Sequence, residues 1–469
     1  AKSIGAIGSA HSTVEELHLL AKLVRGLGSD NVDFRARHAD FVNIDGDVAG
    51  LPSARWLGTS IASLSNLQRV LVVGSFLRKD HPLFAQRIRQ ATRKGAKVHS
   101  VNAAHDDWLM TMSSTTSVAP SGWVQALADI ATAIGASNGA SSPLAGDASD
   151  EAKAIAASLA SGERKAILLG NAAAQHPQAA ALLSLANWIG AQTGASVGYL
   201  TEAANTVGAQ LVGAMPKSGG LNAGQMLAGP ALKACLLLNV EPTLDAANAA
   251  AASVAMQAAE MVVVLTPFKN VANEFADVML PIAPFSETSG TFVNAEGRVQ
   301  SFHGVVKPLG ETRPAWKVLR VLGNLLALKG FDFETSEEVR AEALGDVTTI
   351  ASRLSNQSNA SVSAAAGVSG FERIADVPIY ATDSLVRRAS SLQLTADARA
   401  PFASLPPALW SQLGLSAGDK VRVSQGSAQA VLPARVDATL AATAVRVPAG
   451  HPDTAALGAM FGAVTVEKA

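Results

Sequence analysis

The stretch RVLVVGSFLRKDHPLFAQRIRQATRKGAKVHSVN, residues 69–102, combines two apolar runs with an amphipathic segment between them. The first run, 70–74, is rich in valine, as strands buried in parallel sheets are. The segment 81–94 has the composition of a helix, and Gly95 suits the left-handed position that ends helices. A second strand follows at 96–101. The stretch therefore predicts a β-α-β unit of a parallel sheet.

The same alternation of strands and helices continues on both sides of this unit. Strands are predicted at 3–9, 165–170, 196–200, 233–239, 260–265 and 277–281, and helices at 12–28, 150–161 and 177–194. Ser12 and Glu15 have the spacing of a capping box, so the first helix is predicted to begin after Ser12. Repeated β-α alternation of this kind is typical of an α/β protein with parallel sheets.

Two polar stretches of small residues interrupt the pattern, at 136–150 and at 356–370. Both are predicted to be linkers or loops. Beyond about residue 378 the sequence changes to short β-branched runs separated by Gly, Pro and Asp. This pattern of short runs predicts a small β-rich domain, which we expect to be a barrel.

Composition excludes several classes of function. Hydrophobic residues make up 48% of the 469 residues and charged residues 16%, so a large core is expected. The formal net charge of -1 does not fit a basic nucleic-acid-binding surface, and no run of about 18 strongly apolar residues predicts a membrane span. Cys235 is the only cysteine, so this chain cannot supply the thiolates of an iron–sulfur cluster. We interpret Cys235 as a small buried hydrophobic residue in a protein of a reducing compartment.

Several common enzymatic motifs are absent from the sequence, which has no P-loop, no GxGxxG at a helix start and no HExxH. What remains are turns at the ends of predicted strands, which collect at one edge of a parallel sheet and can hold anions there. These turns are Gly74–Ser75, Gly170–Asn171, 239–241 and 281–300. The last contains SETSGTFVNAEGRVQ, residues 286–300, a polar loop with two glycines that is a candidate ligand site.

Three segments together resemble the molybdopterin oxidoreductase superfamily, which includes formate dehydrogenases. They are VLVVGSFLRKDHPLFAQRIRQATRKGAKV, ADVMLPIAPFSETSGTFVNAEGRVQ and LWSQLGLSAGDKVRVSQGSAQAVLPARV, in this order. The beginning of the chain, IGSAHSTVEELHLLAKLVRGLGSDNVDFRARHADF, resembles more narrowly the family of G subunits of bacterial NADH:quinone oxidoreductase, respiratory complex I. The resemblance implies two interleaved parallel-sheet α/β domains followed by a double-psi β-barrel.

The domain boundaries that the resemblance implies agree with the changes in sequence pattern described above. The expected parts are residues 1–68 for the first part of α/β domain A, 69–230 for α/β domain B, 231–355 for the return part of domain A, 356–377 for a linker and 378–469 for the barrel.

Two departures from the family pattern argue against a functioning pterin site. In catalytic relatives the segment matching DFRARHAD carries a Cys or selenocysteine that ligates the metal, and here the matching residue is Ala39. A shift of one residue in the match places Asp40 there instead, and a carboxylate can bind molybdenum. In relatives that bind the cofactor, the strand matching AKVHSVN ends in Asp-Pro-Arg, whose Asp pairs with a guanine edge. Here that position is Asn102, which presents one acceptor beside a donor.

The resemblance leads us to expect a structural, cofactor-free module with no catalytic residue and no metal site. Its iron–sulfur clusters are expected in an N-terminal part that precedes this chain, and its partners are those domains and other peripheral-arm subunits. The expected location is the cytoplasmic inner face of the bacterial plasma membrane, without a membrane span. The alternatives are a molybdopterin-dependent oxidoreductase fragment that uses Asp40, or a scaffold that retains a nucleotide-binding cleft.

Seven residues are candidates for a vestigial cofactor pocket: Gly74, Ser75, Asn102, Glu287, Asn294, Glu296 and Arg298. For Glu296 and Arg298 the structural interpretation is that they pair and hold their loop against neighbouring strands. Buried polar groups must be satisfied whether or not a ligand is bound, so we favour this interpretation.

Overall fold

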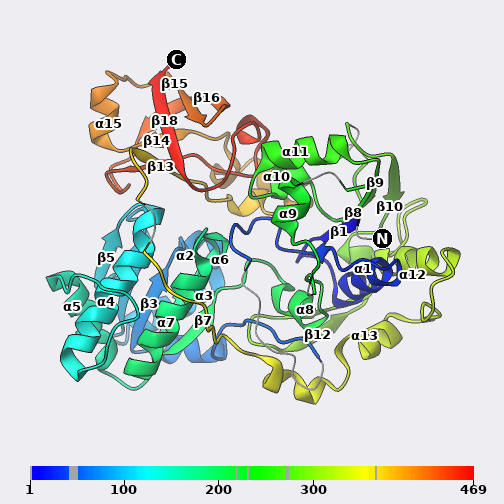
Figure 1. Cartoon of the computed structure of the whole chain (residues 1–469), viewed down its shortest axis with the longest axis horizontal. Helices are drawn as coiled ribbons and strands as arrows, with labels where there is room; N and C mark the ends of the chain where they lie inside the picture. The colour runs from blue at the N-terminus through cyan, green and yellow to red at the C-terminus, as the bar shows by residue number, and fades with distance from the viewer. Residues whose placement is uncertain (1–2, 42–50, 218, 230–231, 270–273, 365–366) are drawn as a thin grey trace.

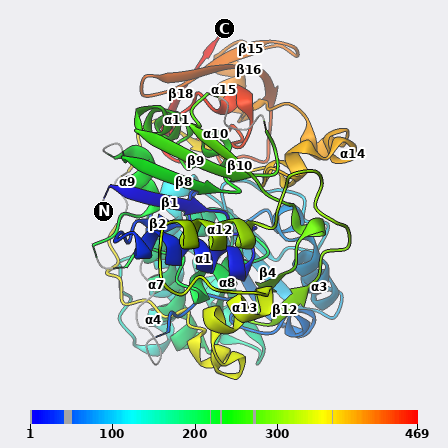
Figure 2. The ribbon, with the colours of Figure 1, turned by 90° about the vertical axis from the view of Figure 1, so that its right-hand side faces the viewer.

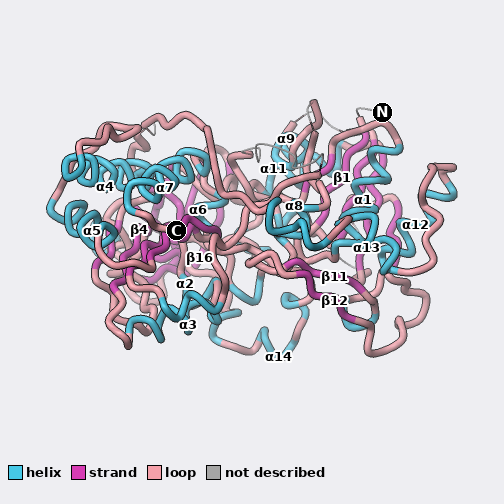
Figure 3. Tube along the Cα trace, turned by 90° about the horizontal axis from the view of Figure 1, so that it is seen from below, coloured by secondary structure: helices cyan, strands magenta, loops and turns pink. Residues whose placement is uncertain are grey.

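The computed structural model of the chain contains two parallel β-sheets and a closed β-barrel (Figure 1). The structure describes residues 3–41, 51–217, 219–229, 232–269, 274–364 and 367–469. The two sheets with their helices lie side by side when the molecule is seen from below (Figure 3), and the barrel lies above them with the C-terminus (Figure 1).

The first sheet has the strand order β10-β9-β8-β1-β2, and all of its strands run parallel. Its strands are β1 (Ile4–Gly8), β2 (Val32–Asp33), β8 (Ala234–Leu238), β9 (Met261–Thr266) and β10 (Val278–Pro281). Figure 2 shows β1, β8, β9 and β10 running next to one another below the barrel. One face packs on α1 (Val14–Gly26) and α12 (Ala315–Leu325), and the other on α9 (Ala223–Ala228) and α11 (Ala249–Ala258).

The second sheet has the order β5-β4-β3-β6-β7 and is also parallel throughout. Its strands are β3 (Arg69–Val73), β4 (Lys97–Asn102), β5 (Ser114–Ser117), β6 (Lys165–Leu169) and β7 (Ser196–Tyr199). One face packs on α4 (Trp123–Asn138), α5 (Asp150–Ala160) and α7 (Ala179–Thr193), and the other on α3 (Pro82–Thr92). The predicted β-α-β unit is confirmed as β3, α3 and β4, with a short extra helix α2 (Leu77–Asp80) before α3.

The first sheet is built from two distant parts of the chain. Strands β1 and β2 precede all strands of the second sheet, and β8 to β10 follow them. The chain therefore leaves the first sheet, builds the second and returns, which confirms the predicted interleaved architecture. Cys235 lies on β8, fully buried, and burial raises the pKa of its thiol to about 12.

The barrel closes in the order β13-β17-β14-β16-β15-β18. Its strands are β13 (Phe371–Ile374), β14 (Ala403–Leu405), β15 (Lys420–Gln425), β16 (Ala428–Val436), β17 (Ala444–Arg446) and β18 (Ala463–Lys468). The first of them lies inside residues 356–377, for which the sequence predicts only a linker. The run FERI is short and charged, so its pattern alone does not mark a strand, and its pairing with β17 and β18 makes it one.

The predicted start of α1 is wrong by one residue. Thr13, not Ser12, is the N-cap, and its hydroxyl accepts from the N–H of Glu16 at 3.2 Å while Glu16 accepts from the N–H of Thr13 at 2.9 Å. Glu15 instead accepts from the N–H of Thr291 at 2.9 Å. Ser12–Glu15 and Thr13–Glu16 have the same spacing, so the sequence alone does not separate them.

A β-hairpin occupies the stretch for which the sequence predicts a ligand loop. Strands β11 (Gly290–Val293) and β12 (Val299–Phe302) pair antiparallel beside the first sheet. Gly290 lies against the start of α1, where an added Cβ would come within 2.4 Å of the Thr13 Cγ2 atom.

The remaining helices are short connections. They are α6 (Asn171–Gln175), α8 (Thr206–Leu211), α10 (Pro242–Asp245), α13 (Ser336–Leu344), α14 (Ser390–Gln393) and α15 (Pro407–Gln412). Within the part of the chain that the structure describes, no helix combines the length and the apolar character needed to cross a bilayer.

Candidate functional site

The segments that follow β2 and β7 meet, and this brings the carboxyl edges of the two sheets together. His38, beyond β2, and Glu202, beyond β7, are joined by a hydrogen bond of 2.7 Å between Nε2 and Oε2. The other oxygen of Glu202 accepts from the Gln175 amide. Burial alone would raise the pKa of Glu202, but its interactions with His38, Gln175 and Arg37 hold that pKa below the ordinary value. This hydrogen bond thus connects the two α/β domains.

The position expected to match the metal ligand of catalytic relatives lies in this meeting zone. Ala39 is exposed, and its backbone N–H donates to the carbonyl of Gln175 at 3.3 Å. Asp40 Oδ2 accepts from the N–H of Ala180 at 2.9 Å, in the first turn of α7. A carboxylate at a helix N-terminus satisfies a free N–H and interacts favourably with the helix dipole. Asp40 therefore has a structural role as the cap of α7.

A cavity of about 60 Å³ lies between the two domains at this place. Its lining includes Arg35, His38, Asp40, Arg55, Tyr199 and Glu202. Ligand pockets usually measure roughly 300–1,000 Å³, so this cavity is smaller than a typical ligand pocket. Its cations are engaged within the protein: Arg35 pairs with Asp33 at 2.9 Å, and Arg55 donates to the Tyr199 hydroxyl at 3.2 Å.

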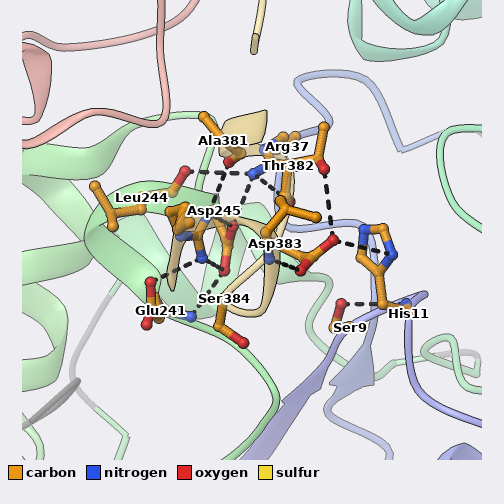
Figure 4. A network of polar contacts seen from close by, with 12 residues as sticks. Ser9, His11, Arg37, Glu241, Leu244, Asp245, Ala381, Thr382, Asp383 and Ser384 are labelled. Carbon is orange, nitrogen blue, oxygen red and sulfur yellow. Dashed lines mark hydrogen bonds and ion pairs between the residues drawn. The ribbon is translucent and has the colours of Figure 1, made fainter. Parts of the chain in front are cut away.

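A buried ionic network covers the carboxyl edge of the first sheet (Figure 4). Arg387 donates to both carboxylate oxygens of Asp245, at 2.9 and 3.1 Å, and lies 2.8 Å from Glu241. Arg388 pairs with Glu241 at 2.6 Å, and Arg37 with Asp245 at 2.7 Å. The two acids follow β8, whereas Arg387 and Arg388 belong to the segment between β13 and β14. Residues 379–399, which we call the covering segment, are thus anchored over the first sheet.

The opposite charges in this network shift the pKa values of Asp245 and Arg387. Burial would raise the pKa of Asp245, but the charges of Arg387 and Arg37 hold that pKa below its ordinary value. The pKa of Arg387 is raised, because Asp245 and Glu241 outweigh the effect of burial. Ions removed from water need such partners. Side chains of the protein therefore occupy the edge where an open parallel sheet usually binds its ligand.

Three of the candidate pocket residues lie at the corresponding edge of the second sheet, where β3 and β4 end. Asn102 donates from Nδ2 to the carbonyl of Ser75 at 2.9 Å, and Ser75 donates from its hydroxyl to Asp80 Oδ2 at 2.8 Å. Gly74 has φ +62°, and a Cβ there would come within 2.6 Å of the Ala173 nitrogen. This strand-end turn is closed by its own hydrogen bonds, and the donor group of Asn102 points into the turn.

The other four candidate residues lie on or next to the hairpin. Glu296 accepts from the N–H of Ile61 at 2.7 Å and pairs with Arg298 at 3.2 Å. Asn294 Oδ1 accepts from the N–H groups of Glu296 and Arg298, so it shapes the hairpin turn. Glu287 accepts from the N–H of Leu309 at 2.9 Å. The structure thus contains the Glu296–Arg298 pair, and Glu296 and Glu287 also accept hydrogen bonds from neighbouring segments.

The seven candidates thus belong to two separate places, the β3–β4 edge and the hairpin, and none of them lines the 60 Å³ cavity. The ionic network was not predicted from the sequence. Its members include Glu241, Asp245, Arg387 and Arg388. The adjacent arginines 387 and 388 are a signal, but their acidic partners lie more than 140 residues earlier in the sequence.

Metal-binding geometry is absent from the described segments: no three His, Cys, Asp or Glu side chains there are grouped so that they could hold a metal ion. Cys235 is buried inside β8, away from the sheet edge.

Comparison with known proteins assigns this architecture to a family. The molybdopterin oxidoreductase model matches residues 1–325. The chain belongs to the molybdopterin oxidoreductase family. Among solved structures of this fold, acetylene hydratase from Pelobacter acetylenicus superposes with a TM-score of 0.58 at 13% identity, covering 100% of this chain and 86% of that one.

Among curated proteins, this member of the molybdopterin oxidoreductase family is similar to the G subunit of NADH-quinone oxidoreductase. The identity is 29% over 359 residues with the Streptomyces coelicolor protein, covering 66% of this chain and 40% of that protein. With the Mycobacterium bovis protein it is 28% over 342 residues, covering 65% and 39%. The chain thus spans about two fifths of the length of these relatives.

Proposed function

We propose that this chain is a structural, cofactor-free module of the G subunit of a bacterial NADH:quinone oxidoreductase. It supports the iron–sulfur domains that pass electrons from NADH toward quinone, and contributes no catalytic residue itself. The proposed location is the peripheral arm, on the cytoplasmic face of the plasma membrane. Similarity to the G subunits of two bacteria supports the parent assembly.

The main observation behind the cofactor-free proposal is that neither Ala39 nor Asp40 offers a free metal-binding side chain. The Ala39 side chain has no atom able to bind a metal, and the Asp40 carboxylate caps α7. The cavity beside Asp40, about 60 Å³, is too small for a pterin cofactor. These residues therefore do not fit a metal-bound pterin, and the ionic network covers the neighbouring sheet edge with protein side chains.

Genetic replacement in the source organism tests the structural role. A strain whose natural gene lacks the region encoding residues 1–469 is expected to lose most of its membrane NADH:quinone activity and the assembled peripheral arm. Restoring the wild-type region recovers both, and restoring a region with Asp40→Ala recovers them equally well. Normal activity in the deletion strain would refute the proposed role.

A second candidate function, a nucleotide-binding scaffold, is favoured by one observation. A cavity of about 360 Å³ lies between the β3–α2 turn and the barrel, and its lining includes Phe76, Lys79, Arg399, Phe402, Arg435 and Arg446. Some of these cations are already paired, Lys79 with Asp397 at 2.6 Å and Arg446 with Asp106 at 2.8 Å. Calorimetric titration with GTP, GDP and NADH separates the two functions, because the cofactor-free scaffold gives no binding heat with any of them.

A further inference from the structure

Four large apolar side chains stand exposed on a short 3₁₀ helix (Phe285–Glu287) and on the neighbouring loop after β12. Phe285 is 61% exposed, Val305 81%, Val306 58% and Leu309 78%. Single exposed apolar residues are normal on protein surfaces, whereas a group of them marks an interaction site. We call these four residues the apolar patch.

The loops that carry the apolar patch are held together by hydrogen bonds. The carbonyl of Ser286 accepts from the N–H groups of Val305 and Val306 at 2.9 and 3.3 Å. Glu287 accepts from the N–H of Leu309 at 2.9 Å, and Gly304 lies where a Cβ would come within 3.1 Å of the Glu287 backbone. A surface that is ordered before binding loses little conformational entropy when a partner docks.

Charged residues next to the patch have mostly one sign. Residues 303–321 contain Lys307, Arg313, Lys317 and Arg320 and one acid, Glu311, and a second acid, Glu287, contacts Leu309 of the patch. Of these, Lys307 and Lys317 are exposed, whereas Arg313 pairs with Glu311 at 3.8 Å and Arg320 with Glu334 at 3.7 Å. Apolar side chains beside exposed cations complement a partner surface that is apolar at its centre and acidic at its edge.

We propose that the apolar patch docks on an acidic and apolar surface of another subunit of the assembly. This inference rests on the proposed function. A second copy of the chain fits poorly, because a two-fold interface would set the same cations against one another. A lipid surface fits poorly too, because surface-bound segments usually bury the apolar face of an amphipathic helix, and here the apolar groups stand on hydrogen-bonded loops.

Aspartate substitution in the patch tests the proposal in the natural full-length gene product. The tagged wild-type protein is purified from the source organism, and the other peripheral-arm subunits that accompany it are quantified. Leu309→Asp and Val305→Asp are each expected to reduce that recovery at least tenfold, the change that corresponds to losing about 1.4 kcal/mol of binding. Leu394→Asp is the matched control, since Leu394 is 88% exposed but lies on the covering segment. It should leave recovery unchanged.

The outcomes separate the inference from the proposed function. If the wild-type protein recovers no such subunits, the proposed function fails and this inference fails with it. If the wild type recovers them and Leu309→Asp recovers them equally, only the inference is refuted. Each variant is exposed at its site, so its melting temperature should match the wild type, and an unfolded variant is replaced by Leu309→Ser.

Charge reversal and two direct binding measurements complete the test. Lys307→Glu should weaken recovery severalfold, whereas Lys153→Glu, on the exposed face of α5, should not. Concentration-dependent dimers in sedimentation that Leu309→Asp abolishes would replace the proposed partner with a second copy. Binding to anionic phosphatidylglycerol vesicles that Leu309→Asp abolishes would replace it with a membrane. Either result overturns the proposal.

Discussion

At the scale of single residues, Asp40 decides between a structural and a catalytic interpretation of the site. Its carboxylate accepts from the Ala180 N–H at 2.9 Å and serves as the cap that α7 otherwise lacks, because the Gln178 side chain at the N-cap position makes no capping hydrogen bond to the helix. Asp40→Ala should therefore lower the free energy of unfolding by about 1 kcal/mol. Urea denaturation measures this. Unchanged stability combined with lost enzyme activity would instead indicate a catalytic role.

The buried carboxyl group of Glu16 should make the free energy of unfolding depend on pH. Burial raises its pKa from 4.5 to about 7, against the effect of its hydrogen bonds with Thr13. Between these two values the folded protein keeps a proton that the unfolded chain releases, so this carboxyl favours folding less as pH rises through that window. Glu16→Gln removes the ionisation. The stability of the variant relative to wild type should increase from pH 5 to pH 8, by an amount on the order of 1 kcal/mol or more.

Glu338→Gln is the matched control for this measurement. Glu338 forms the same capping box with Thr335 at the start of α13, but it is exposed. Its substitution alters the same capping contacts at an exposed position, so it separates the effect of the cap from the effect of burial. If the difference between Glu16→Gln and wild type stays constant from pH 5 to pH 8, the account of Glu16 burial is wrong.

At the scale of elements, the covering segment depends on its arginines. Arg387 contacts Asp245 and Glu241, both buried at the end of β8. Arg387→Met removes the cation that the two acids share, and each acid keeps one other arginine, Arg37 or Arg388. Breaking a buried ion pair costs roughly 3–5 kcal/mol when the remaining charge has no partner. We therefore expect a loss of up to this size in urea denaturation, together with faster protease cleavage within residues 379–399. Lys153→Met, which removes an exposed pair of 3.6 Å, is the control and should change little.

Local elements are largely predictable from the sequence, and contacts between distant segments are not. Valine-rich runs and helix stops place β3, α3 and β4, because these patterns act within a few residues. The hairpin β11–β12 resembles a loop in the sequence, since its strands are only four residues long and interrupt a parallel α/β pattern. Glu241 and Arg387 are far apart in sequence, so only the folded structure shows their pairing.

At the scale of the whole molecule, the family assignment and the site geometry point in different directions. The chain belongs to the molybdopterin oxidoreductase family and retains its two sheets and barrel. At the meeting of the two carboxyl edges, however, protein side chains satisfy one another: His38 with Glu202, Asp40 with α7 and Arg387 with Asp245. A fold can persist while its site changes, because function depends on the site and not on the fold.

Metal and pterin content tests the central claim most directly. The natural full-length protein is purified from cells that make active molybdenum enzymes, its molybdenum and tungsten are measured by mass spectrometry, and its pterin by fluorescence after acid oxidation. A molybdopterin enzyme purified from the same cells serves as the positive control. We predict less than about 0.1 mol of either metal per mol of protein, against the single cofactor per chain that an active site would hold, and no pterin fluorescence. Stoichiometric molybdenum or tungsten together with pterin would contradict the account.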